Sequence, residues 1–199
     1  MGGLVARAHV EDDRRYRGDV ERLLQVAPPN HGSDLARVRV LLELWEHRDA
    51  REDTGRVAAS IGDGLGQAGD DLTPGSAFLE RLNAGGRRAG VRYAILAGTR
   101  GLLTEEEARA WSGRLTSMAG TDTTLRAALL RRAADEVAQH EEFRHGVGDL
   151  AVSTRSARLE GAHAYEEIDA THLTIDRRGA DGTIPCLPFL LRELTAERE

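Results

Sequence analysis

The sequence lacks several features that would point to a particular class of protein. It has one cysteine, Cys186, which excludes an internal disulfide framework and a zinc site built from several cysteines. It has no apolar run close to the roughly 20 residues of a membrane-spanning helix, and no secretory signal opens it. Its 27 lysines and arginines face 33 aspartates and glutamates, so it lacks the basic excess typical of nucleic-acid-binding domains. We therefore expect no nucleic-acid partner and no membrane span, and the cytoplasm is the default location.

The composition that remains suits a globular domain of 199 residues, because 40% are hydrophobic and 30% are charged. Three short segments, 20–27, 91–97 and 164–170, have the character of strands and end at turn residues. Helical patterns separate them, which favours a parallel βαβ-type arrangement. The expected helices cover 1–10, 34–47, a short segment after Ser76, 108–118 behind a capping box of Thr104 and Glu107, 122–139, and a segment after Pro188.

Two motifs resemble a cofactor site or a metal site by their letters, but neither has the context that such a site needs. The segment 64–69 matches the letters G-x-G-x-x-G, but no strand precedes it and Asp63, Asp70 and Asp71 would repel a pyrophosphate. We expect a flexible loop there. His140 and His145 lie five residues apart, which on a helix separates them by about 140° and prevents them from sharing one metal. The sequence thus predicts no cofactor and no metal.

Four segments, in order along the chain, carry a resemblance to a known family. Residues 1–7 read Met-Gly-Gly-Leu-Val-Ala-Arg, similar to the second half of the nucleophile elbow Gly-His-Ser-Met-Gly-Gly in the α/β-hydrolase family, especially its lipases and esterases. The later segments that resemble the family are 27–33, 71–79, and 148–153 with 170–173. The resemblance implies a partial α/β-hydrolase fold with about three parallel strands, the last of the sheet, with surrounding helices and a helical insertion.

The resemblance also implies one incomplete domain over residues 1–199. Its expected parts are a helix and strand after the elbow (1–33), a helical cap region (34–90), a strand (91–98), a helical insertion (99–148), and an acid and histidine segment with a terminal helix (149–199). Whether the insertion between 103 and 145 acts as a lid or is inert stays open.

In this family the catalytic serine, acid and histidine follow one another along the chain. Asp149 and His172 occupy the positions of the acid and the histidine. Asp149 could instead cap the helix near Ser153 or close a turn, and His172 alone would be an ordinary loop histidine. Asp169 competes as the acid, although we expect it inside a strand. Met1 stands where the family donates an oxyanion-hole amide, but its nitrogen here is a free amine.

No nucleophile completes this set. The serines lie at 33, 60, 76, 112, 117, 153 and 156, and none falls in Gly-x-Ser-x-Gly. The sequence thus resembles the carboxyl-terminal portion of a lipase- or esterase-like serine hydrolase, inactive alone and acting on small-molecule or lipid esters only when the missing segment completes it. The alternative is a non-catalytic remnant or binding module with a hydrolase-derived fold. Because the first strand would lack its neighbour, we also expect dimerisation through a sheet edge.

Overall fold

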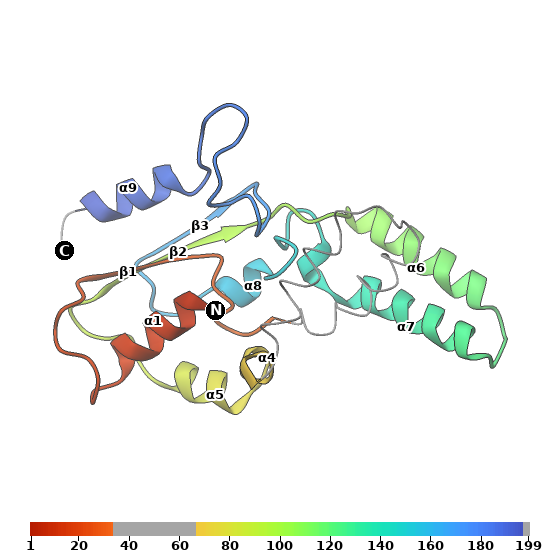
Figure 1. The fold of residues 1–199 in the computed structure, drawn as a ribbon, viewed down its shortest axis with the longest axis horizontal. Helices are drawn as coiled ribbons and strands as arrows, with labels where there is room; N and C mark the ends of the chain where they lie inside the picture. Colours follow the sequence, from red (N-terminus) through yellow and green to blue (C-terminus); the bar gives the residue numbers. More distant parts are fainter. Residues whose placement is uncertain (34–66, 197–199) are drawn as a thin grey trace.

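A three-stranded parallel sheet forms the centre of the computed structural model, which describes residues 1–33 and 67–196 (Figure 1). The strands are β1 (Arg22–Val26), β2 (Arg92–Gly98) and β3 (Ala164–Ile168), in the order β1-β2-β3. Leu24 pairs with Ala94, and Leu96 pairs with Glu166. The expected partial α/β fold with three parallel strands is confirmed.

Helices cover both faces of this sheet (Figure 1). One face carries α1 (Gly2–Glu11), α5 (Ala77–Ala84) and α8 (Thr154–Ala157), with α4 (Gln67–Leu72) beside α5; the opposite face carries α9 (Leu187–Thr195). Between β2 and β3 the chain leaves the body as α6 (Glu105–Ala119) and returns as α7 (Leu125–Gln139), followed by the 3-10 helix η1 (Glu141–Phe143).

The strands bury alternate residues on the two faces, as the pleat of a sheet requires. Leu24, Ala94 and Leu96 belong to the cluster that includes Phe189 of α9. Leu23, Tyr93 and Ile95 belong to the cluster on the other face, together with Val10 of α1. The central strand β2 is therefore buried on both sides, and its carboxyl end has a fixed position.

Local capping signals place the helices where the sequence predicts them. The Ser76 hydroxyl accepts a hydrogen bond from the Leu79 amide at 3.3 Å and begins α5. Thr104 and Glu107 form the expected capping box at the start of α6. Such caps satisfy amide donors that the first turn of a helix leaves free.

The buried side of α1 differs from the side that the sequence favours. The pattern places Leu4, Val5 and Ala8 together, but Val5 is 63% exposed and the buried residues are Leu4, Arg7 and Val10. Spacing by three residues puts these three on one side of the helix. An arginine occupies the middle of this side because polar groups of neighbouring elements surround it, as described below.

The helical arm formed by α6 and α7 extends away from the sheet (Figure 1). The two helices pack against each other. Among the side chains of these two helices that the structure describes, the buried ones are all small: Ala108, Ala119, Ala127, Ala133 and Ala134. Small side chains let two helices approach closely, so the arm is held by its own contacts. The lid interpretation stays a prediction.

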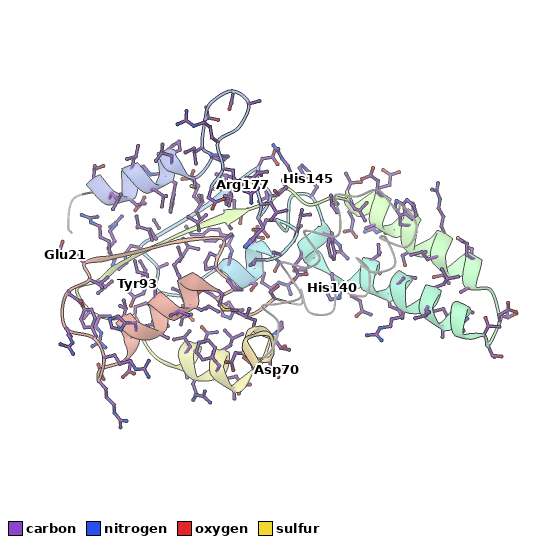
Figure 2. All side chains as sticks on the ribbon, viewed as in Figure 1. Glu21, Asp70, Tyr93, His140, His145 and Arg177 are labelled. Atoms are coloured by element: carbon purple, nitrogen blue, oxygen red, sulfur yellow. The ribbon has the colours of Figure 1, made fainter. Side chains whose placement is uncertain are left out.

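Three further expectations concern the helix at 34–47, the loop at 64–69 and the two histidines at 140 and 145. The helix expected at 34–47 lies outside the described residues. Of the segment 64–69, the part that the structure describes begins α4 and is helical, so the expectation of a flexible loop is wrong there. His140 precedes η1 and does not share an α-helix with His145, and Figure 2 shows the two histidines apart from each other.

Candidate active site

The carboxyl ends of β2 and β3 bring together the two residues that the sequence predicts as acid and histidine. The His172 Nδ1 atom lies 2.9 Å from the Asp149 Oδ2 atom. The His172 backbone amide also donates to the Asp149 carbonyl oxygen at 2.7 Å. Asp149 is 1% exposed, whereas the His172 side chain is 36% exposed. A buried carboxylate thus faces one nitrogen of an imidazole that solvent can reach.

A tight turn holds the Asp149 carboxylate. Its Oδ1 atom accepts hydrogen bonds from the amides of Ala151 at 3.0 Å and Val152 at 2.8 Å. The Asp149 amide donates to the Val152 carbonyl at 3.1 Å, and Leu150 adopts a φ of 86°. The residue that caps α8 is Ser153. Asp149 therefore closes a turn, as one sequence alternative has it, and contacts His172 with its second oxygen.

This geometry fixes which imidazole nitrogen carries the proton. A carboxylate is only an acceptor, so Nδ1 of His172 must be the donor to Asp149. Nε2 of the neutral ring is then the acceptor. A histidine in this state can take a proton from a nucleophile that lies within hydrogen-bond reach of Nε2.

Asp169, the competing candidate for the acid, has a different partner. Strand β3 ends at Ile168, so the expectation that Asp169 lies inside the strand is wrong. Its carboxylate accepts from Arg100 Nε at 2.9 Å and Nη2 at 2.7 Å, and both side chains are more than half exposed. The hydrogen bond from Arg100 holds the pKa of Asp169 below its ordinary value.

Met1 directly precedes α1, whose first turn lies at the carboxyl end of β1. It is the N-cap residue of α1, and its carbonyl accepts from the Leu4 amide at 2.9 Å. The Gly3 carbonyl accepts from Gln25 Nε2 at 2.7 Å, which ties the first turn of α1 to the carboxyl end of β1. The role of Met1 as an oxyanion-hole donor stays a prediction.

Four of the described serines have structural hydrogen bonds. Ser33 donates to the Ala151 carbonyl and Ser76 to the Asp71 carbonyl. Ser153 caps α8, and Ser156 donates to the Gly32 carbonyl. Ser112 and Ser117 lie on α6, in the arm. Of these four serines, Ser33 donates a side-chain hydrogen bond to the turn that holds Asp149.

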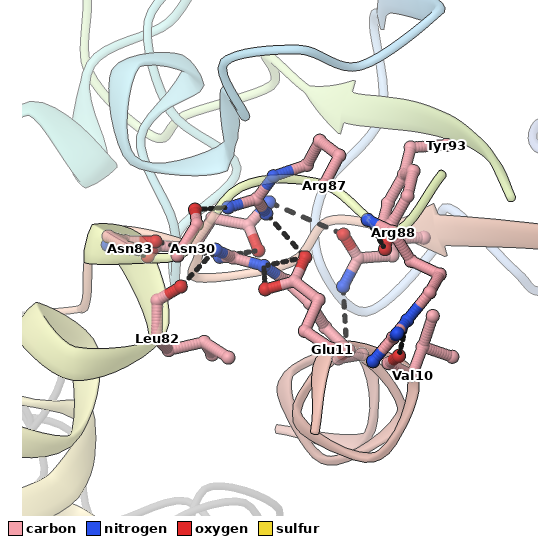
Figure 3. A network of polar contacts seen from close by, with 12 residues as sticks. Val10, Glu11, Asn30, Leu82, Asn83, Arg87, Arg88 and Tyr93 are labelled. Carbon is pink, nitrogen blue, oxygen red and sulfur yellow. Dashed lines mark hydrogen bonds and ion pairs between the residues drawn. The ribbon is translucent and has the colours of Figure 1, made fainter. Parts of the chain in front are cut away.

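A buried polar network ties α1 to the loop after β1 and to α5, and Figure 3 shows Glu11, Asn30 and Asn83 from these three segments close together. The Arg7 side chain is fully buried and donates to Glu11 at 3.0 Å, Asn83 at 2.8 Å and Asn30 at 3.3 Å. Glu11 also pairs with Arg87 at 2.6 Å. Burial lowers the pKa of Arg7, and its bond to Glu11 opposes that effect.

The sequence pattern does not single out this network. Arg7 and Asn30 fall in segments that carry the family resemblance, yet no local signal marks either as buried. The available hint is the position of Arg7, three residues from both Leu4 and Val10.

Among the residues described, no group of three or more histidine, cysteine, aspartate or glutamate side chains is placed to hold a metal ion. No helix within residues 1–33 and 67–196 has the length and apolar character needed to cross a membrane.

The parallel sheet and its surrounding helices form a partial α/β fold, and comparison with solved structures agrees with this fold. The propeptide form of the lipase BlEst2 of Bacillus licheniformis is similar, with a TM-score of 0.50 and 19% identity over 100% of this chain and 35% of that chain. Its mature form has a TM-score of 0.48 and 19% identity over 97% of this chain and 61% of that one. The chain thus spans less than two thirds of either. No family model matches the sequence, and no curated protein does.

Proposed function

We propose that Asp149 and His172 are the acid and the base of a serine hydrolase that acts on carboxylic esters. The hydrogen bond of 2.9 Å between a buried carboxylate and a half-buried imidazole carries this proposal. Ester hydrolysis by a triad needs such a pair, because the carboxylate orients the ring and stabilises the imidazolium that forms when the nucleophile loses its proton.

The proposed nucleophile is a serine outside the sequence given, one residue before Met1 in the elbow that residues 1–7 resemble. In support, α1 begins at Gly2 and its first turn is tied to the carboxyl end of β1. A nucleophile at the start of this helix would lie near the carboxyl ends of the strands, where Asp149 and His172 also lie. The substrate would be a small-molecule or lipid ester, and the 199-residue chain alone would be inactive.

The DNA before the Met1 codon provides the first test. In-frame codons for Gly-His-Ser, preceded by codons for an apolar strand, are expected. A stop codon directly before Met1 would contradict the proposal and favour the alternative, a non-catalytic remnant or binding module.

Hydrolysis of p-nitrophenyl esters by the extended protein provides the second test. We expect Asp149→Asn to lower kcat by about 10⁴-fold, because the amide no longer holds the correct tautomer of His172. His172→Ala should also abolish turnover. Asp169→Asn is the matched control. It also removes a carboxylate that follows β3, but this carboxylate pairs with Arg100 and not with His172. Loss of activity in Asp169→Asn but not in Asp149→Asn would overturn the assignment, as would robust turnover by the 199-residue chain that His172→Ala removes.

A further inference from the structure

One peptide group lies between the loop after β1 and the catalytic pair. It joins Ala151 to Val152. Its carbonyl oxygen accepts a hydrogen bond of 2.5 Å from the Ser33 hydroxyl, and its N–H donates to Asp149 Oδ1 at 2.8 Å. The other carboxylate oxygen contacts His172 Nδ1. A continuous path of hydrogen bonds therefore runs from the Ser33 hydroxyl through a peptide and a carboxylate to the imidazole.

The path is effective because it is buried. Ser33 is 8% exposed, Val152 4% and Asp149 1%. In such surroundings hydrogen bonds in a chain polarise one another, and each strengthens the next by about 10–30%. A donor on the Ala151 carbonyl makes the Val152 N–H a stronger donor to Asp149. That N–H is one of the two amides that stabilise the buried carboxylate charge.

The turn that holds Asp149 also needs support from outside. Leu150 has a φ of 86°, a left-handed conformation that is unfavourable for a leucine. Such backbone persists where surrounding contacts fix it. The Ser33 hydroxyl is a contact of this kind. It donates to the Ala151 carbonyl and so holds the 151–152 peptide, which begins one residue after Leu150.

The loop that carries Ser33 has its own anchors. The Ser33 amide donates to the Leu72 carbonyl at 2.8 Å, the His31 amide to the Ser156 carbonyl at 3.0 Å, and Asn30 Nδ2 to the Ala157 carbonyl at 2.9 Å. Removal of the Ser33 hydroxyl therefore leaves several bonds that hold the loop against α8.

We propose that Ser33 is a positioning residue for the Asp149–His172 pair, acting through the 151–152 peptide. This inference rests on the proposed function, because it concerns the same acid and base. Ser33 does not touch the reacting atoms. Its hydroxyl holds the turn so that one carboxylate oxygen is occupied by backbone amides and the other is directed at His172 Nδ1.

The test is NMR spectroscopy of the isotope-labelled 199-residue chain, which needs no enzymatic activity. In the wild type, at alkaline pH where the imidazole is neutral, the nitrogen shifts of His172 should show the proton on Nδ1. In Ser33→Ala we expect a mixture of the two tautomers and about tenfold faster hydrogen exchange of the Val152 amide. Ser33→Thr, which keeps the hydroxyl, should restore both signals.

Ser156→Ala is the matched control. The Ser156 hydroxyl also bridges the loop to α8, through the Gly32 carbonyl, but does not touch the 151–152 peptide. It should destabilise the fold while leaving the His172 tautomer and Val152 exchange unchanged. If Ser33→Ala fails to fold, Ser33→Cys, with its weaker S–H donor, replaces it in the comparison.

Two results would overturn the inference: wild-type His172 and Val152 signals in Ser33→Ala, or equal changes in Ser156→Ala. A different result would contradict the proposed function. The extended protein would then fail to hydrolyse esters, although Ser33→Ala still changes the His172 and Val152 signals.

Discussion

Gly98 and Asp149 approach so closely that a β-carbon at position 98 would lie 2.8 Å from the β-carbon of Asp149. The same atom would lie 2.6 Å from the Ala170 carbonyl oxygen. Gly98 is the last residue of β2, so the missing side chain is what lets the Asp149 turn and the segment before His172 meet at the end of this strand.

Replacement of this glycine should therefore disturb the contact between Asp149 and His172 as well as the fold. We expect Gly98→Ala to lower the free energy of unfolding by about 1–3 kcal/mol, because the added methyl group meets backbone that cannot rotate away. The NMR signal of the His172–Asp149 hydrogen bond should shift or broaden. Gly113→Ala is a suitable control, since Gly113 lies in α6 with no atom within 4 Å of an added β-carbon. It should be neutral or stabilise by up to about 1 kcal/mol.

The Arg7 network predicts a large loss of stability when the arginine is removed. Arg7→Met should lower the free energy of unfolding by about 3 kcal/mol or more, because Glu11, Asn30 and Asn83 lose a buried donor. Denaturation with urea measures the change. Arg15→Met, at a side chain that is 74% exposed, should change stability by less than about 0.5 kcal/mol. Equal effects of the two substitutions would contradict the structural role of Arg7.

His31 predicts one component of the pH dependence of stability. Desolvation, with the positive charge of Arg7 as the second cause, lowers the pKa of His31 from its ordinary value of 6.5. The folded state therefore favours the neutral ring, and its contribution to stability is present above pH 6.5. It is lost as the pH falls through the lowered pKa, because the unfolded chain binds the proton more readily. Urea denaturation between pH 5 and 8 should show this loss in the wild type and a smaller loss in His31→Asn. An identical pH dependence in both proteins would contradict it.

The outer edge of β1 predicts self-association of the 199-residue chain. Within the described residues β1 is the first strand of the sheet and has one neighbour, β2. The hydrogen bonds to β2 include Arg92 N–H to the Glu21 carbonyl and Ala27 N–H to the Leu96 carbonyl. Its other side carries backbone donors and acceptors that a second strand could use. Size-exclusion chromatography with light scattering should show a dimer whose fraction rises with concentration. A compact monomer with one cooperative thermal transition would contradict this expectation.

Much of the fold follows from short-range pattern. The apolar segments ending at Pro28, Gly98 and Thr171 give the three strands within a few residues. The Ser76 cap and the capping box of Thr104 and Glu107 fix two helix starts. The order of the acid and histidine segments in the family resemblance selects Asp149 and His172, which the structure brings together. The strand and cap signals succeed because strand alternation and helix capping depend on residues at most four positions apart.

What the sequence by itself determined is the three strands, most of the described helices and the two candidate site residues. Only the tertiary structure decided that Asp169 pairs with Arg100, that Arg7 is buried, and that Ser33 reaches the Asp149 turn. The contacts of Arg7 with Asn83 and of Ser33 with Ala151 join residues 76 and 118 positions apart. Such contacts depend on how the strands are ordered and on which ends of them meet. Local periodicity carries no record of that order, because it arises only when the separate helices and strands pack into one core.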